Sequence, residues 1–161
     1  MDDLETRDLG LEQRELFRHW PAGVSVVVAE SDGRRAGLTV SSLISMSLDP
    51  PLVAISLSHT ASLYEVLREA GEWTASILSG EQDHLAQHFA RSVPPLVLWD
   101  GIPVRDDDPR LIADAVGWLW VRTIDEFRVG DHTLFVGEVL NLERGKASSS
   151  LVYMDRHYTG L

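Results

Sequence analysis

The feature that most constrains the fold is a series of short apolar stretches, rich in β-branched residues and separated by turn residues. Two pairs of these stretches are joined by the turns Ser31-Asp32-Gly33 and Val129-Gly130-Asp131. So short a connection joins antiparallel strands, because parallel strands need a much longer crossover. The strand-like stretches are residues 24–29, 36–42, 52–57, 72–78, 115–127, 133–142 and 151–154. The sequence therefore predicts a mainly antiparallel β-fold.

Three other stretches have the periodicity of amphipathic helices. They are residues 9–20, 62–70 and 82–90. Pro21 stops the first, and Ser62 with Glu65 has the spacing of a capping box at the start of the second. Residues 91–110 hold four prolines, which favours a surface excursion. No repeat or linker divides residues 1–161, so we expect one domain, an antiparallel β-barrel with helical decoration.

Composition excludes several classes of function. The formal charge of −11 disfavours nucleic acid as a partner, because an acidic surface repels phosphate backbones. The absence of cysteine removes disulfides and thiolate chemistry and suits a reducing cytoplasm. The acidic N-terminus and the lack of a long apolar run favour a cytoplasmic protein that does not enter the membrane. The fingerprints of Rossmann dehydrogenases, P-loop NTPases and serine hydrolases do not occur.

Hydroxyl side chains gather in one segment, directly before Asp49-Pro50-Pro51. They are Thr39, Ser41, Ser42, Ser45 and Ser47. A loop with this composition presents hydroxyls and amides together and donates hydrogen bonds without the desolvation cost of a buried lysine. The sequence thus allows a neutral binding site for a phosphate or a polar ring. The alternative is an ordinary turn capped by serine and threonine.

The segment that runs from Gly37 through Thr39-Val40-Ser41-Ser42 to Pro50-Pro51-Leu52-Val53 resembles the signature of the flavin reductase-like proteins, which are FMN-binding split barrels. Three further segments fit the same family in the same order. They are Pro21-Ala22-Gly23-Val24, residues 82–90 ending in Phe89-Ala90, and residues 130–139. The resemblance covers about residues 14–158. It implies a homodimer that passes hydride from NADH or NADPH to FMN or FAD, with the reduced flavin supplied to a partner monooxygenase.

The resemblance also implies which residues form the site. Residues implied to bind the flavin are Thr39, Val40, Ser41, Ser42, Ser45, Ser47, Pro51, His59, Ser62 and Ser76. Thr39, Ser41 and Ser42 are expected at the ring or ribityl chain, whereas Ser45, Ser47 and residues 59–62 are expected near the chain and phosphate. Ser76 stands where many members have an amide donor. His132 is expected beside the nicotinamide, as the catalytic residue; without the resemblance it would be a turn residue, as Ser62 would be a helix cap.

Other signals carry less weight. His84 and His88 share a helical face but lack the glutamate of a zinc motif, so we expect no metal. Trp118 and Trp120 are expected in a core or dimer interface, and the C-terminal Tyr153, Arg156, His157 and Tyr158 as an exposed tail. Two other functions stay open: a non-catalytic flavin- or haem-binding carrier or sensor, and an FMN-dependent oxidase of a small molecule. Hydride transfer needs alignment of two cofactors more than acid or base groups, which fits the absence of a catalytic dyad.

Overall fold

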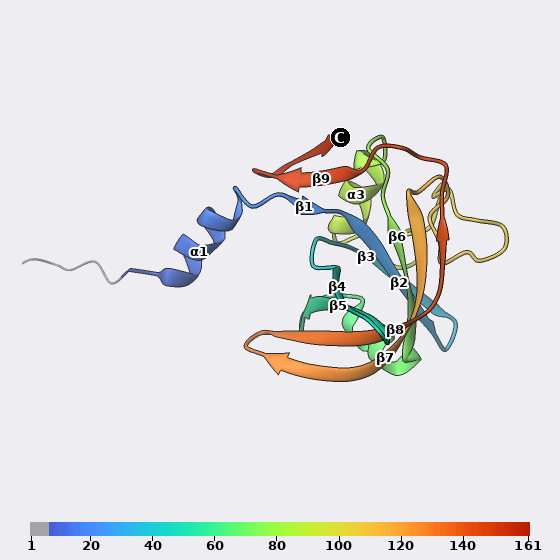
Figure 1. Cartoon of the computed structure of the whole chain (residues 1–161), viewed down its shortest axis with the longest axis horizontal. Helices are drawn as coiled ribbons and strands as arrows, with labels where there is room; N and C mark the ends of the chain where they lie inside the picture. Colours follow the sequence, from blue (N-terminus) through green and yellow to red (C-terminus); the bar gives the residue numbers. More distant parts are fainter. Residues whose placement is uncertain (1–6) are drawn as a thin grey trace, which may run out of the picture.

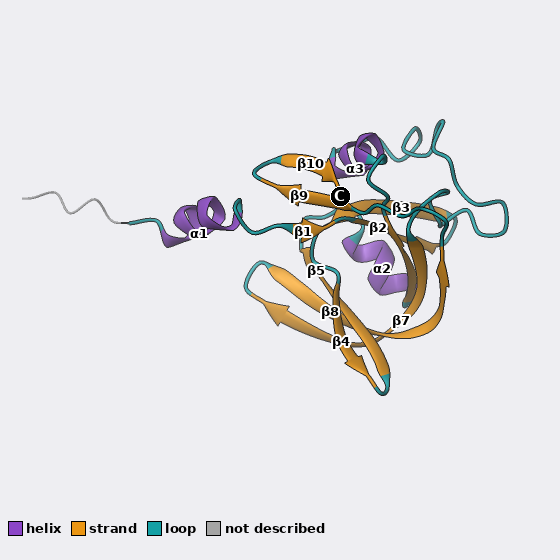
Figure 2. Cartoon of the chain, turned by 45° about the horizontal axis from the view of Figure 1, so that its top comes forward, coloured by secondary structure: helices purple, strands orange, loops and turns teal. Residues whose placement is uncertain are grey.

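The computed structural model describes residues 7–161, and Figures 1 and 2 show a β body with three short helices. The helices are α1 (Leu9–Phe17), α2 (Tyr64–Ala70) and α3 (Asp83–Ala90). The strands are β1 (Ala22–Gly23), β2 (Ser25–Ser31), β3 (Arg34–Val40), β4 (Ile44–Leu48), β5 (Pro51–Ser58), β6 (Glu72–Ile77), β7 (Gly117–Val129), β8 (His132–Arg144), β9 (Leu151–Met154) and β10 (His157–Gly160). No helix within residues 7–161 is both long enough and apolar enough to cross a membrane.

Seven strands form the main sheet, in the order β3-β2-β6-β7-β8-β5-β4, and every described pairing in it is antiparallel. Both predicted hairpins, β2-β3 and β7-β8, are confirmed. Asp32 and Gly33 both have positive φ at the first turn, which suits the tight turns of two-residue hairpins. The edge strands β3 and β4 stand at opposite ends of the order, so the sheet is not closed by pairing between them. A smaller sheet, β1-β9-β10, packs beside it.

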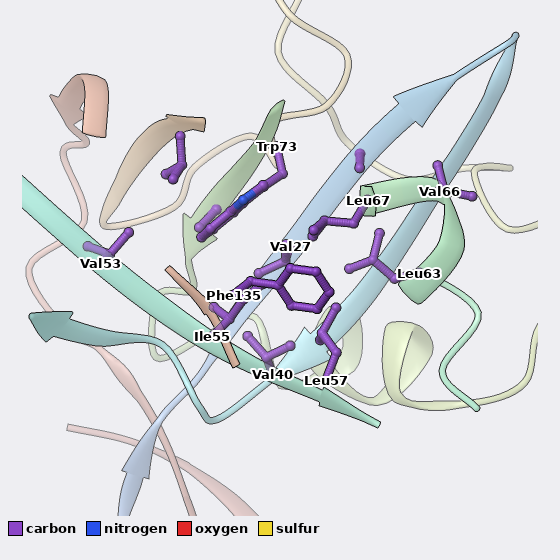
Figure 3. Packing of buried hydrophobic residues seen from close by; sticks show 13 residues of the cluster. Val27, Val40, Val53, Ile55, Leu57, Leu63, Val66, Leu67, Trp73 and Phe135 are labelled. Carbon is purple, nitrogen blue, oxygen red and sulfur yellow. The ribbon is translucent and has the colours of Figure 1, made fainter. Parts of the chain in front are cut away.

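The main core lies between α2 and the inner face of the sheet (Figure 3). Alternate residues of β5 point toward it, so Ile55 and Leu57 are buried against Leu63, Leu67 and Phe135. A second cluster lies under α3, where Leu85, Ala86 and Phe89 pack against β2 and the excursion of residues 91–110. Each fully buried aliphatic side chain contributes about 1.5–3 kcal/mol. The two helices therefore hold the ends of β3 and β5 in fixed positions.

The structure corrects several predictions. The first helix ends at Phe17 instead of Trp20, and among residues 7–161 no residue of α1 is buried, so its apolar side chains are exposed. Figures 1 and 2 both show α1 standing away from the body. The capping box at Ser62 is wrong: Leu63 takes the N-cap position and no side chain caps α2. Burial of Leu63 in the core fixes where the helix starts.

Three strands, β1, β4 and β10, are absent from the seven predicted stretches. β4 occupies residues for which the hydroxyl-rich sequence favours a loop; its hydrogen bonds come from β5. The C-terminal residues form β10: Arg156 and His157 are exposed as expected, but Tyr153 and Tyr158 are partly buried. Tyr158 packs against Tyr153 with ring centroids 5.0 Å apart, and burial raises the pKa of Tyr158.

Candidate active site

The hydroxyl residues of the predicted site separate into two groups along β5. The first group lies where β3 ends and consists of Thr39, Val40, Ser41 and Ser42. β3 ends at Val40, and residues 41–43 cross to β4 without pairing with another strand. Ser42 lies against β5: its Oγ donates to the Ser56 carbonyl (3.0 Å) and accepts from the Ser56 N–H (3.1 Å). Thr39 Oγ1 donates to the Ala86 carbonyl of α3 (2.6 Å). Ser41 is exposed at this crossing, whereas Val40 is buried.

The second group lies toward the other end of β5. Ser45 is opposite Val53, Ser47 is opposite Leu52, and Pro51 begins the strand. Leu52 and Ser58 mark the two ends of the pairing between β5 and β8, and they lie roughly 20 Å apart at about 3.3 Å per residue. Within one chain, the second group therefore does not reach the phosphate position expected beside His59. The resemblance placed both sets at one phosphate, and the structure does not bring them together.

His59 is held in place at the far end of β5. Its Nε2 lies 3.0 Å from Thr133 Oγ1, which also lies 2.8 Å from the hydroxyl of Tyr64. The His59 N–H donates to the Asp131 carbonyl at 3.0 Å. His59 therefore holds the loop after β5 against the start of β8, and its Nε2 is already engaged with Thr133.

His132 is the first residue of β8, opposite Ser58, and its side chain is 45% exposed. Its Nδ1 lies 2.7 Å from Asp131 Oδ1. The hydrogen bond to His132 holds the pKa of Asp131 below its usual range, so the carboxylate is ionised and only accepts. Nδ1 is therefore the donor of this hydrogen bond, and Nε2 is the ring nitrogen that has no bond to Asp131.

The strand register places His132 and the Ser42 crossing on one side of the sheet. Ser58 is opposite His132 and Ser56 is opposite Leu134, while the intervening Leu57 is buried in the core. Since alternate residues of a strand share a face, His132, Ser56 and Ser58 lie on the outer face of β5 and β8. Ser42, bonded to Ser56, adjoins the same face two residues further along β5. We call the outer-face surface formed by Ser41, Ser42, Ser56, Ser58 and His132 the hydroxyl band.

A small hollow of about 90 Å³ adjoins the hydroxyl band on the side of β9 and β10. It is lined by Val24, Thr39, Val40, Ser41, Ala90, Tyr153 and Tyr158. Sequence reasoning did not assign the two tyrosines to the site: Tyr153 lies in the predicted strand 151–154, and both were expected in an exposed tail. For Tyr158, the signal for a strand was its place between the polar His157 and Thr159.

Two predicted residues lie elsewhere. Ser76 is fully buried in β6, and its Oγ accepts from the Ile112 N–H at 3.0 Å, so its hydroxyl is already engaged inside the protein. A role as an exposed amide substitute does not fit this position. Ser62 is exposed but faces a groove beside β3 instead of the hydroxyl band.

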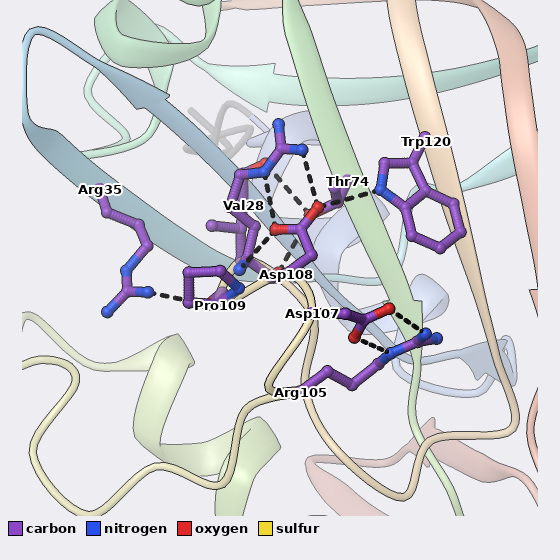
Figure 4. Close-up of polar contacts among 9 residues, drawn as sticks. Val28, Arg35, Thr74, Arg105, Asp107, Asp108, Pro109 and Trp120 are labelled. Carbon is purple, nitrogen blue, oxygen red and sulfur yellow. Dashed lines mark hydrogen bonds and ion pairs between the residues drawn. The ribbon is translucent and has the colours of Figure 1, made fainter.

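The other polar clusters have structural partners. Within residues 7–161, no three histidine, aspartate or glutamate side chains gather as a metal site. His88 Nε2 lies 2.7 Å from the Leu98 carbonyl. Trp120 Nε1 donates to Asp108 at 3.0 Å (Figure 4). A hollow of about 840 Å³ lies at the start of α3 and contains none of the predicted site residues.

The residues of the hydroxyl band fit a flavin. A flavin presents a flat ring with polar edges and a hydroxylated chain, which need neutral donors and acceptors next to an apolar surface. Ser41 is exposed, the crossing at residues 41–43 leaves backbone outside the strand pairing, and Val24, Val40 and the two tyrosines supply apolar surface. The hollow itself is far smaller than a typical cofactor pocket of about 300–1,000 Å³, so in the single chain it can offer a flavin no more than one wall.

The chain is similar along most of its length to several known reductases. A NADH:FMN oxidoreductase of Rhodococcus qingshengii is 32% identical over 161 residues, covering 97% of this chain and 84% of that protein. The reductase component of a 4-hydroxyphenylacetate 3-monooxygenase of Thermus thermophilus is 34% identical over 149 residues, covering 92% and 94%. A solved NADH:FAD oxidoreductase of Streptomyces globisporus superposes with a TM-score of 0.86 at 28% identity, covering 98% of this chain and 96% of the other. The model of the flavin reductase like domain matches residues 17–161, and the chain therefore belongs to the flavin reductase-like family.

Proposed function

We propose that the protein is an NAD(P)H-dependent flavin reductase that provides reduced FMN or FAD to a flavin-dependent monooxygenase. The observation that carries this proposal is the hydroxyl band. It puts Ser41, the backbone that Ser42 holds in place, and His132 Nε2 on one open face. Membership of the family and relatives such as the Thermus thermophilus reductase component support it.

Each part of the band has a distinct task. A bound flavin supplies the acceptor for the hydride of the reduced nicotinamide. Ser41 and the backbone of residues 41–43 bind the polar edge of the ring, while Ser42 keeps that crossing in place through Ser56. His132, oriented by Asp131, accepts a hydrogen bond at Nε2 from the nicotinamide carboxamide. The protein thus contributes alignment, which is the main requirement of a hydride transfer between two cofactors.

We infer that the working form is a homodimer of split barrels, each chain being a single domain. The outer face that carries His132 also exposes apolar side chains: Ile44 is 49% exposed, Phe127 50% and Val129 59%. Their strand partners, Ala54, Leu134 and His132, place all three on that face. A second copy laid over it buries this apolar surface and closes the open side of the hydroxyl band. The absence of cysteine suits the reducing cytoplasm, where we expect the dimer to work.

A steady-state assay tests the activity. The purified protein is mixed with NADH or NADPH and with FMN or FAD in all four pairings, and nicotinamide oxidation is followed at its near-ultraviolet absorbance. Oxidation that requires both protein and added flavin is the expected result. Flavin binding without turnover in every pairing would instead identify a carrier or sensor, and the reductase assignment would be wrong.

A further inference from the structure

Three side chains meet behind His132, on the side of the sheet opposite to the hydroxyl band. Thr133 follows His132 on β8, so its side chain points to the inner face, and only 3% of the residue is exposed. Thr133 Oγ1 lies 2.8 Å from the Tyr64 hydroxyl and 3.0 Å from His59 Nε2. We call Tyr64, Thr133 and His59 the Thr133 network. The tasks assigned so far to the hydroxyl band include none of its contacts.

The Thr133 network is anchored in the core at its Tyr64 end. Tyr64 is the first residue of α2, and its ring meets the fully buried ring of Phe135 edge to face, with the ring centroids 5.6 Å apart. The Tyr64 ring also meets the His59 ring edge to face, at 5.3 Å. Aromatic rings in contact favour such geometries, so packing as well as hydrogen bonding holds the His59 ring. The network is therefore a fixed support on the inner side of the sheet.

One backbone hydrogen bond connects this support to the turn that carries Asp131. The His59 N–H donates to the Asp131 carbonyl at 3.0 Å. The Asp131 carboxylate, 2.7 Å from His132 Nδ1, orients the imidazole, yet the Asp131 side chain is 93% exposed. An exposed pair contributes little by itself, because holding two solvated side chains in one geometry costs entropy. The backbone that carries the pair must therefore be fixed from elsewhere, and His59 fixes it.

Thr133 is the residue that joins the two ends of the network. A threonine hydroxyl donates one hydrogen bond and accepts others, so it bridges Tyr64 and His59 in either direction. If His59 carries its proton on Nδ1, Tyr64 donates to Thr133 and Thr133 donates to His59; if the proton is on Nε2, both bonds reverse. Removal of the hydroxyl breaks both contacts in either case, whereas the half-buried Tyr64 and His59 can turn to water.

We propose that Thr133, Tyr64 and His59 are positioning residues, which hold Asp131 and thereby His132 in the orientation that the nicotinamide requires. This inference rests on the proposed reductase function and adds to it residues on the inner side of the sheet. Where two reactants must be aligned, a displacement of about 1 Å can cost about a hundredfold in rate. Loosening of the turn at Asp131 should therefore slow the oxidation of the nicotinamide through His132.

Thr133→Val tests the proposal, because it removes the hydroxyl and keeps the branching and the approximate size of the side chain. The measurement is kcat/KM for NADH or NADPH at saturating flavin, in the wild type and in His132→Ala. In the wild-type background we expect a decrease of about tenfold, as for a displacement well below 1 Å. In the His132→Ala background the same substitution should change kcat/KM by less than about twofold, because the ring that it positions is gone.

Two further variants and one control make the kinetic result specific. Thr133→Ser keeps the hydroxyl and should stay within about threefold of the wild type. Tyr64→Phe removes a single hydrogen bond and should give the same pattern as Thr133→Val with a smaller decrease, of about threefold. The matched control is Thr123→Val on β7, whose Oγ1 accepts from Trp73 Nε1 at 3.2 Å away from the Asp131 turn. It should leave kcat/KM within about twofold in both backgrounds.

The tautomer of His132 gives a readout that needs no turnover. In the wild type, Asp131 selects the form with the proton on Nδ1, which nitrogen-15 NMR of the imidazole distinguishes at alkaline pH. Thr133→Val should lose this preference, and Thr123→Val should keep it. Retention of the Nδ1–H form in Thr133→Val would overturn the positioning role.

The kinetic outcomes separate this inference from the reductase proposal. An equal decrease of kcat/KM on Thr133→Val in both backgrounds, no decrease in the wild-type background, or an equal decrease in Thr123→Val would overturn the positioning role and leave the reductase proposal standing. A wild type that oxidises no nicotinamide with either flavin would overturn the reductase proposal, and the His132 tautomer would then decide by itself whether Thr133 positions the ring.

Discussion

Asp108 holds the long excursion of residues 91–110 against the sheet, and its replacement by asparagine gives a test of that role (Figure 4). The carboxylate accepts four hydrogen bonds: from the Arg110 N–H at 3.0 Å, Arg110 Nε at 3.0 Å, Arg110 Nη2 at 2.8 Å and Trp120 Nε1 at 3.0 Å. Only 16% of the Asp108 side chain is exposed. The backbone of Arg110 is held as well, because its carbonyl accepts a hydrogen bond from Thr74 Oγ1 at 3.0 Å.

Asp108→Asn keeps the size of the side chain but turns one acceptor oxygen into a donor. Whichever way the amide lies, the two donors that face the new NH₂ group lose their acceptor, and the guanidinium of Arg110 loses its counter-charge. At about 1–1.5 kcal/mol for each hydrogen bond lost, we expect the free energy of unfolding to fall by about 2–3 kcal/mol. For a chain of this size that corresponds to a decrease in Tm of roughly 5–10 °C.

Urea and thermal unfolding at pH 7 measure the effect, with Asp106→Asn as the matched control. Asp106 is exposed, lies two residues away, and makes no side-chain hydrogen bond to residues 7–161, so its change should stay within about 0.5 kcal/mol. If the free energy of unfolding falls by less than about 0.5 kcal/mol in Asp108→Asn, or by the same amount in both variants, Asp108 does not hold residues 91–110 against the sheet.

The pH dependence of the Asp108→Asn effect follows from the pKa of Asp108. Burial raises this pKa, but the hydrogen bonds from Arg110 and Trp120 outweigh burial and hold it below the ordinary value of 3.8. A folded-state pKa below the unfolded value stabilises the protein above the unfolded pKa. The difference between wild type and Asp108→Asn should therefore be the same at pH 7 and pH 5. It should shrink only below about pH 4, as the pH falls through the folded-state pKa.

Four other changes have defined outcomes. Gly137→Ala directs a methyl group into Val121 Cγ1 in the core, so the free energy of unfolding in urea should fall by at least about 1–3 kcal/mol. His132→Ala should slow nicotinamide oxidation while the flavin Kd from calorimetry stays within about twofold; an equal loss of flavin binding would contradict its assignment to the nicotinamide. Ser42→Ala leaves the Ser56 N–H without its partner and should raise the Kd values of FMN and FAD alike. Phe127→Glu should convert the proposed dimer to monomer in light scattering, and an unchanged mass would exclude the outer face as the interface.

The parts of the fold that local sequence determines were predicted well. The hairpin β2-β3 follows from alternating residues around Asp32-Gly33, and α3 follows from its apolar stripe. β4 was missed because serine-rich residues have little preference for strands, and its hydrogen bonds come from β5, which lies across a turn of proline residues. The start of α2 was misplaced because Leu63 is buried in the core, and that burial outweighs the local capping signal of Ser62.

For the site, the residue types could be predicted but not their distances. The positions of Ser42 and Ser47 differ by only five residues in sequence, yet their partners Ser56 and Leu52 stand at different points along β5. The pairing of β4 with β5, which has a register shift between Ser45 and Ser47, sets this separation. The register of two paired strands cannot be predicted from the pattern of residues alone. The same holds for Ser76, whose alternation in β6 turns its hydroxyl inward to the Ile112 N–H.

The proposed site explains how so acidic a chain can hold an anionic cofactor. Long-range repulsion from a net charge of −11 is screened beyond about 8–10 Å at physiological salt, so it opposes the approach of the ligand more than the bound state. In the proposed site, Ser41 and the backbone of residues 41–43 bind the ring without charge and avoid the desolvation cost of a buried cation.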